Sequence, residues 1–274
     1  MKIRNWLTLG AAALAAALAG PAAAQGNAAS NAGNYPDRPI RLIVPFPPGG
    51  TSDVVGRIFA EALGKQIGQP VVVENRGGAG GTVGSRAVAS ATPDGYTLLL
   101  GTSSTNGTNS AVYKNLPYDA VKDFTPVTQI IRVPGVIVVN KNFPAKDYAA
   151  FFALIKGAPG KYSYASSGNG GATHMAMEYY KSLSGLDMMH VPYRGTGPAL
   201  NDVIAGQVPI LWDTAASSMA HIQSGSLRAI VVAAKKRLPQ LPDVPTFAEV
   251  GLPDYDAEMW NGPVSYTHLT LPTS

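Results

Sequence analysis

From residue 40 onward, short runs of β-branched and apolar residues alternate with stretches whose apolar residues recur at helical spacing. Such alternation is typical of βαβ units, in which helices cover both faces of a largely parallel sheet. The extended runs are residues 40–46, 71–74, 96–100, 136–139, 162–165, 188–191, 210–212 and 227–232, and the helical patterns are residues 54–63, 172–183, 200–204 and 219–222. Gly206 and Gly225 follow the last two patterns and predict where those helices end. The sequence therefore predicts an α/β fold with parallel-rich sheets.

Four of the predicted strands are followed by loops rich in Gly, Ser, Thr and Asn, at residues 47–53, 76–82, 101–106 and 166–173. Open α/β sheets bind ligands at the carboxyl ends of their strands. Glycine lets the backbone approach a ligand closely, and a helix N-terminus presents free N–H groups to an anion. Each loop alone is equally well explained as a tight turn, but four of them together favour a binding site.

The composition limits the kinds of site that the chain can form. Hydrophobic residues make up 46% of the chain and charged residues 14%, which favours a folded core, and the cysteine count of 0 excludes disulfides, thiol nucleophiles and thiolate metal ligands. The net charge is +4 and falls to +2 if Lys2 and Arg4 are removed with a signal segment. A charge this small gives no basis for nucleic-acid binding and is compatible with a small anionic ligand.

The N-terminus has the pattern of an export signal. Lys2 and Arg4 precede an apolar run at residues 7–18, and Pro21 is followed by three alanines. This predicts a signal peptide at residues 1–24, cleaved between Ala24 and Gln25, and location in the periplasm. The alternative, a membrane anchor, needs about 20 apolar residues, and this run is shorter. Residues 25–34 are small and polar and predict a flexible leader.

Signatures of enzyme active sites are absent or incomplete in the sequence. There is no G-x-S-x-G motif and no P-loop. Residues 78–83 approach the dinucleotide-binding fingerprint, but Val83 stands where its third glycine belongs. The chain has four histidines, His174, His190, His221 and His268, and none of them has the spacing of metal ligands. We therefore expect no catalytic residue, no metal ion and no cofactor.

A domain boundary is expected at Val133-Pro134-Gly135, which interrupts an otherwise extended stretch at residues 125–140. A Pro-Gly interruption of this kind is suited to a hinge between two lobes. Ligands often lie in the cleft between such lobes.

Several motifs in fixed order resemble one family of binding proteins. They are YPDRPIRLIVPFPPGG at residues 35–50, VVVENR at 71–76, GGT at 80–82, PDGYTLL at 93–99, LPYD at 116–119, KDF at 122–124, YASSGNG at 164–170, HVPYRG at 190–195 and LPDVPT at 241–246. These segments closely resemble the TctC-like substrate-binding proteins of tripartite tricarboxylate transporters, the Bug family. The likeness extends from Tyr35 to about Val264.

The resemblance implies a two-lobed periplasmic-binding-protein fold of type II, a Venus flytrap. Lobe 1 would comprise residues 35–132, lobe 2 residues 133–250, and residues 251–264 would return towards lobe 1. The implied function is capture of a small carboxylate, such as a di- or tricarboxylate, an aromatic acid or an acidic amino acid. The implied partners are the membrane permease subunits of the transporter, with a monomeric binding protein. Two alternatives are a secreted α/β enzyme acting on a small organic acid and a ligand-sensing module for a membrane receptor.

The resemblance also implies which residues bind the ligand, in loops that follow strands of both lobes. Tyr193 and Arg194 either line the cleft or lie on the surface, and Asp213 either meets a ligand amine, hydroxyl or water, or caps the following helix. The expected ligand-binding residues are Gly49, Gly50, Thr51, Asp53, Thr102, Ser103, Ser167, Asn169, Thr173, His174, Tyr193, Arg194 and Asp213.

Two segments depart from the family pattern. Residues 213–216 read Asp-Thr-Ala-Ala where Asn and Pro often follow the aspartate in the family, which bears on ligand identity. Residues 265–274 match nothing in the family and are expected to be a non-native tail. Lobe 1 would then be incomplete at the C-terminus, and part of its apolar sheet would be exposed.

Overall fold

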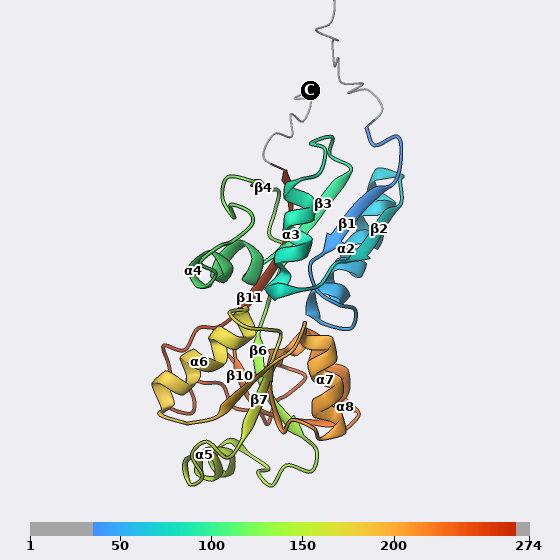
Figure 1. Cartoon of the computed structure of the whole chain (residues 1–274). Helices are drawn as coiled ribbons and strands as arrows, with labels where there is room; N and C mark the ends of the chain where they lie inside the picture. Colours follow the sequence, from blue (N-terminus) through green and yellow to red (C-terminus); the bar gives the residue numbers. More distant parts are fainter. Residues whose placement is uncertain (1–34, 267–274) are drawn as a thin grey trace, which may run out of the picture. The chain divides into compact units, whose positions relative to one another are not determined.

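A computed structural model of the chain describes residues 35–266 (Figure 1). The predicted signal peptide, the predicted leader and residues 267–274 of the predicted tail lie outside the described residues. Ser265 and Tyr266 form the end of strand β11 (Met259–Tyr266). Among residues 35–266, no helix has the length and apolar character needed to cross a membrane.

The first sheet has the strand order β2-β1-β3-β11-β4, and β5 also pairs with β11. Strand β1 is parallel to β2 and β3, whereas β11 is antiparallel to β3, β4 and β5. We call this sheet and its helices lobe 1. Its elements are β1 (Ile40–Val44), α2 (Thr51–Ile67), β2 (Val71–Asn75), a 3-10 turn (Ala79–Gly81), α3 (Thr82–Ala89), β3 (Thr97–Thr102), a π-helical turn (Ser104–Thr108), α4 (Asn109–Val112), β4 (Phe124–Pro126), β5 (Ile131–Val133) and β11.

The second sheet has the strand order β10-β6-β9-β7-β8. Strand β7 is parallel to β8 and β9, and β6 is antiparallel to β9 and β10. We call this sheet and its helices lobe 2. Its elements are β6 (Gly135–Asn140), α5 (Tyr148–Lys156), β7 (Ser163–Ser166), α6 (Ala172–Ser184), β8 (Met189–Pro192), α7 (Thr196–Ala205), β9 (Ile210–Thr214), α8 (Ala215–Gln223) and β10 (Leu227–Ala233).

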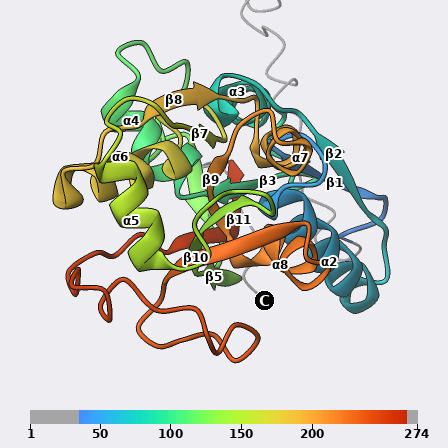
Figure 2. The same ribbon diagram turned by 90° about the horizontal axis from the view of Figure 1, so that it is seen from below.

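Apolar helix faces cover both sides of the second sheet. Met177 of α6 packs in one cluster with Trp212, and Leu200 of α7 packs in another with Leu211. Figures 1 and 2 show α5 and α6 on one side of the sheet and α7 and α8 on the other. Fully burying one such side chain contributes about 1.5–3 kcal/mol, so these two clusters supply much of the stability of lobe 2.

The predicted strand and helix positions are largely confirmed, and the α/β fold is confirmed, but the sheets are more mixed than the alternation suggested. Gly135, the first residue of β6, pairs with Thr214, the last residue of β9, so β6 begins at the end of the sheet where β9 finishes. The chain reaches β6 from β5 through Pro134 alone, without a crossover helix, so β6 enters its sheet from the opposite edge to β7 and β9. Helices α3, α4 and α5 and strand β11 were not predicted, and β4 and β5 were covered only by the prediction that residues 125–140 are extended.

Gly135 lies at the start of β6, where an added Cβ atom would overlap the six-membered ring of Trp212. That ring is fully buried, and its Nε1–H donates a hydrogen bond of 2.9 Å to the hydroxyl of Tyr255. It is therefore held in place and cannot easily yield to a new methyl group.

We expect Gly135→Ala to lower the free energy of unfolding by about 1–3 kcal/mol, the usual cost of overpacking a core. Urea denaturation measures the change. Gly107→Ala is the matched control, because no atom lies within 4 Å of the added Cβ. Equal stability of the two variants would contradict the packing argument.

Candidate functional site

Four helices begin at one pocket that is lined by residues of both lobes. Helices α2, α6, α7 and α8 follow Gly50, Gly171, Gly195 and Thr214, and none of the four N-termini has a side-chain cap. The first N–H groups of a helix have no partner within the helix, and they carry a partial positive charge. The residues that line the pocket are Phe46, Gly50, Thr51, Ser52, Thr102, Ser103, Ser104, Ser167, Thr173, Thr196, Thr214, Met259, Trp260 and Asn261.

The lining of this pocket contains no charged side chain. Hydroxyl groups, the amide of Asn261 and the backbone at the helix starts supply its polarity, while Phe46, Met259 and Trp260 form an apolar wall. The cavity has a volume of about 40 Å³. A cavity needs about 10–15 Å³ by this measure to hold one water, so the space equals that of about three waters and suits a carboxylate group.

Direct contacts join the two lobes around the pocket. The hydroxyls of Thr51 and Thr214 lie 2.6 Å apart, and the N–H of Ala172 donates to Ser104 Oγ at 2.9 Å. A Cβ atom added to Gly197 would overlap the carbonyl oxygen of Pro48. The lobes therefore meet closely, and glycine at position 197 is what allows the backbone of α7 to approach the loop after β1.

Six of the expected ligand-binding residues line the pocket: Gly50, Thr51, Thr102, Ser103, Ser167 and Thr173. The N–H of Gly49 donates to Asp53 Oδ2 at 3.1 Å, and Asp53 Oδ1 lies 3.0 Å from Arg57. Burial raises the pKa of Asp53, but hydrogen bonds from Arg57, Gly49 and Asn75 outweigh it, so the pKa is lowered. Gly49 and Asp53 thus fix the shape of the loop and do not line the pocket.

The other expected residues lie outside the pocket lining. Asn169 is exposed, and its carbonyl oxygen accepts a hydrogen bond of 3.0 Å from Tyr113 of lobe 1. The hydroxyl of Tyr193 donates to Asp202 at 2.6 Å, and Arg194 is exposed. None of these three residues lines the pocket.

Asp213 is fully buried behind the pocket. Its Oδ2 accepts hydrogen bonds of 2.6 Å from both Ser217 and Ser218. Its Oδ1 has no hydrogen-bond partner among the described residues, and burial raises the pKa of the carboxyl group. Asp213 is not the cap of α8, because it still belongs to β9 and Thr214 occupies the cap position.

A chain of hydroxyls connects Asp213 to the contact between the lobes. Ser217 has one proton, which it donates to Asp213, and Thr51 lies 3.0 Å from Ser217 Oγ. Because each hydroxyl has a single proton, Ser217 Oγ can only accept from the two threonines, and Thr214 Oγ1 lies 3.2 Å from it. Asp213 therefore orients hydroxyls of the site through Ser217.

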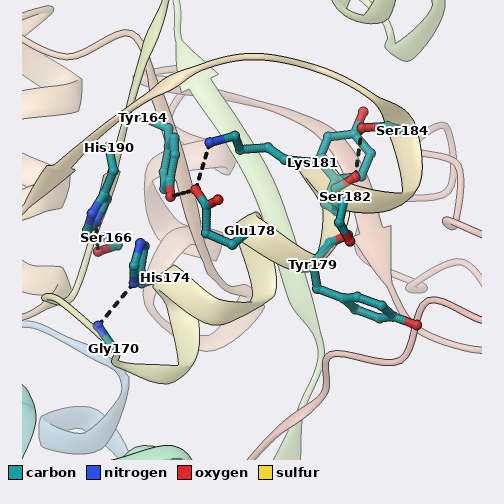
Figure 3. Close-up of polar contacts among 11 residues, drawn as sticks. Tyr164, Ser166, Gly170, His174, Glu178, Tyr179, Lys181, Ser182, Ser184 and His190 are labelled. Atoms are coloured by element: carbon teal, nitrogen blue, oxygen red, sulfur yellow. Dashed lines mark hydrogen bonds and ion pairs between the residues drawn. The ribbon is translucent and has the colours of Figure 1, made fainter. Parts of the chain in front are cut away.

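His174 belongs to a separate cluster in lobe 2, which Figure 3 shows. Its ring stacks on that of His190 with centroids 3.8 Å apart, and the hydroxyl of Tyr164 donates to Glu178, which also pairs with Lys181 at 2.8 Å. The N–H of Gly170 donates to His174 Nδ1 at 3.0 Å, so Nδ1 carries no proton and the ring is neutral.

Several residues that line the pocket were not among the predicted site residues. Ser52 and Ser104 lie within the predicted polar loops, and Thr196 lies between two glycines at the start of α7, so a local signal existed for these three. Asn261 comes from β11, and no local pattern marks it as part of a site. Within residues 35–266, no group of three or more His, Asp or Glu side chains is arranged to hold a metal ion.

The model of the TctC family, the tripartite tricarboxylate transporter family receptor, matches residues 55–268. The chain belongs to this family. Among the relatives of this TctC-family chain, the protein BugT of Bordetella pertussis is 39% identical over 231 residues, covering 84% of this chain and 71% of BugT.

Solved structures of the same kind superpose well on this TctC-family chain. A structure described as a periplasmic transporter has 45% identity and a TM-score of 0.85, and the match covers 86% of this chain and 79% of that one. MatC from Rhodopseudomonas palustris, solved with bound malate, has 35% identity and a TM-score of 0.82, with 87% and 81% covered. The predicted family and its two-lobed fold are confirmed.

The stacked histidines predict how stability depends on pH. Burial lowers the pKa of His174, and burial together with the neighbouring His174 lowers the pKa of His190 to about 4. The unfolded chain, with histidine pKa values near 6.5, binds these protons first, so acidification favours unfolding.

We expect the free energy of unfolding to fall as the pH is lowered from about 6.5 to about 4, because in this range protons bind to the histidines of the unfolded chain more readily than to those of the folded chain. The contribution of the pair is on the order of 1 kcal/mol, because half-exposed groups are screened by solvent. Urea denaturation across this range measures it. His190→Gln should flatten the profile, whereas His221→Gln in α8 should not; identical profiles for all three proteins would refute the assignment.

Proposed function

We propose that this protein is a periplasmic solute-binding protein that captures a small carboxylate between its lobes. The observation that carries the proposal is the convergence of four uncapped helix N-termini on a pocket lined by hydroxyl groups and no charged side chain. Helix N-termini bind anions through free N–H groups and the helix dipole. The malate in MatC, a member of the same structural group, supports an organic acid as the ligand.

The uncharged lining favours binding over catalysis. General acid–base or nucleophilic catalysis needs a side chain of suitable pKa beside the substrate. The polar side chains of the lining are only hydroxyls and one amide, and the stacked rings of His174 and His190 are not part of it. Such a site holds an anion and leaves it unchanged.

Capture requires the lobes to separate and close again. The cavity of about 40 Å³ is too small to admit an organic acid while the lobes are in contact. Only two connections link the sheets, Pro134 between β5 and β6 and the segment between β10 and β11. Opening by rotation about these two segments, followed by closure on the acid, is the hinge motion common to two-lobed binding proteins.

We further propose that the signal pattern at residues 1–24 directs export and that the closed, loaded form is presented to permease subunits of a tripartite tricarboxylate-type transporter. The N-terminal sequence pattern and membership of the receptor family support this role. The closed form differs in surface from the open one, which gives a permease a means to recognise the loaded protein.

The test is ligand-induced stabilisation of the full chain. Malate, adipate, citrate, benzoate and glutamate are each added, and the shift in melting temperature and the heat of binding are measured. We expect at least one acid to stabilise the protein, because a ligand that binds only the folded state raises its stability. A panel without any stabilising acid would count decisively against the proposal.

Closure is tested with Gly197→Ala. The added Cβ would overlap Pro48 of the other lobe, so we expect affinity for the stabilising acid to fall at least tenfold, which corresponds to about 1.4 kcal/mol. The melting temperature without ligand should change little. Gly157→Ala is the control in the same lobe, since its added Cβ lies no closer than 3.2 Å to any atom. Unchanged affinity in Gly197→Ala would show that binding does not need this contact.

A further inference from the structure

A second cavity, of about 400 Å³, borders the pocket at the helix N-termini. It lies between α6 and the segment that leads into β11. Ser103 and Met259 line both cavities, so they lie where the two cavities adjoin.

The small pocket has room for a carboxylate but not for the rest of an organic acid. Around it, the lobes are joined by hydrogen bonds at Thr51 with Thr214 and at Ser104 with Ala172. Beside the bond between Ser104 and Ala172, the boundary with the second cavity also includes the short side chain of Ser103 and the flexible thioether of Met259. Methionine adapts its conformation at low cost, so a bound acid can extend past Met259 into the larger cavity.

The chemistry of the second cavity selects what that extension can be. Met175, Ala176 and Tyr179 of α6 supply an apolar face, and Asp256 and Glu258 supply carboxylates on the opposite segment. Neither cavity has a lysine, arginine or histidine in its lining. A second carboxylate on the ligand would therefore meet like charge with no cation to compensate.

The negative charge of Asp256 and Glu258, on the segment that faces α6 across the second cavity, is only partly neutralised. Glu258 pairs with Arg132 at 3.7 Å, and the Arg132 side chain is 68% exposed. Asp256 has no ion pair within residues 35–266. The Asp256 carboxylate thus remains a net negative charge beside the apolar face.

We infer that the acid captured by this protein carries a single carboxylate, bound at the helix N-termini, and an aromatic or branched apolar body that lies in the second cavity. This inference rests on the proposed function and narrows its ligand class. It sets this chain apart from MatC, whose bound malate has two carboxylates. Specificity for the ligand is then determined by Met259, which lies between the two cavities, by the apolar face of α6, and by the charge of Asp256.

The experiment compares two probes of similar length by isothermal titration on the full chain: 3-phenylpropanoate, with one carboxylate, and adipate, with two. We expect 3-phenylpropanoate to bind at least tenfold more tightly. Asp256→Lys should reduce the ratio of the affinity for 3-phenylpropanoate to the affinity for adipate at least fivefold, because it replaces a charge that repels the second carboxylate of adipate by one that attracts it. Met175→Lys, at a position 38% exposed, should act in the same direction and provides a second variant.

Asp243→Lys is the matched control. It makes the same change of charge at an exposed residue that lines neither cavity, so the ratio should remain that of the parent protein. Tighter binding of adipate than of 3-phenylpropanoate, or a ratio that neither variant moves, would overturn the inference and leave the proposed function standing. Binding of no carboxylate at all would remove both.

Discussion

The first N–H groups of an α-helix cannot be satisfied within that helix, and this constraint organises the site. Four helices begin at one pocket, each after a glycine or threonine and each without a side-chain cap. Glycine before α2, α6 and α7 supplies no capping side chain, and of the first N–H groups that of Ala172 in α6 already donates to Ser104 Oγ. A site of this kind attracts negative charge without burying a cation, which avoids the large cost of desolvating one.

The hydroxyl chain explains why a buried acid lies behind an anion-binding pocket. Asp213 accepts both serine hydroxyls on one oxygen, and burial raises the pKa of its carboxyl group, which disfavours the charged form that would repel an anion. Asp213 also directs the proton of Ser217, so the hydroxyls at the contact between the lobes are ordered while no charged side chain lines the pocket.

Local patterns in the sequence predicted the features that depend on neighbouring residues. The strand cores, the helices after residues 50 and 171 and the polar loops were all marked by apolar periodicity and by glycine. The polar loops contain Gly50, Thr51, Thr102, Ser103, Ser167 and Thr173, which the resemblance to the family implied as ligand-binding residues and which line the pocket. The resemblance to the family gave the two-lobed arrangement, which periodicity alone does not specify.

Features formed by distant segments had no such signal. Asn261 and Met259 reach the pocket only because β11 inserts between β3 and β4, and short strands such as β4 and β5 are too brief for a clear period. His174 followed a polar loop and was assigned to the ligand, yet its ring turns to His190. Side-chain direction at a helix start is decided by packing against other elements, which a sequence pattern does not contain.

The insertion of β11 has a consequence for biogenesis. The central position of lobe 1 is filled by the strand that leaves the ribosome last among the described elements, whereas lobe 2 is built from one continuous stretch. During synthesis, lobe 2 can complete its sheet while lobe 1 still has an unpaired edge on β3. Such an edge is prone to pair with other chains, so a chaperone that shields β3 until β11 arrives would protect this protein against aggregation.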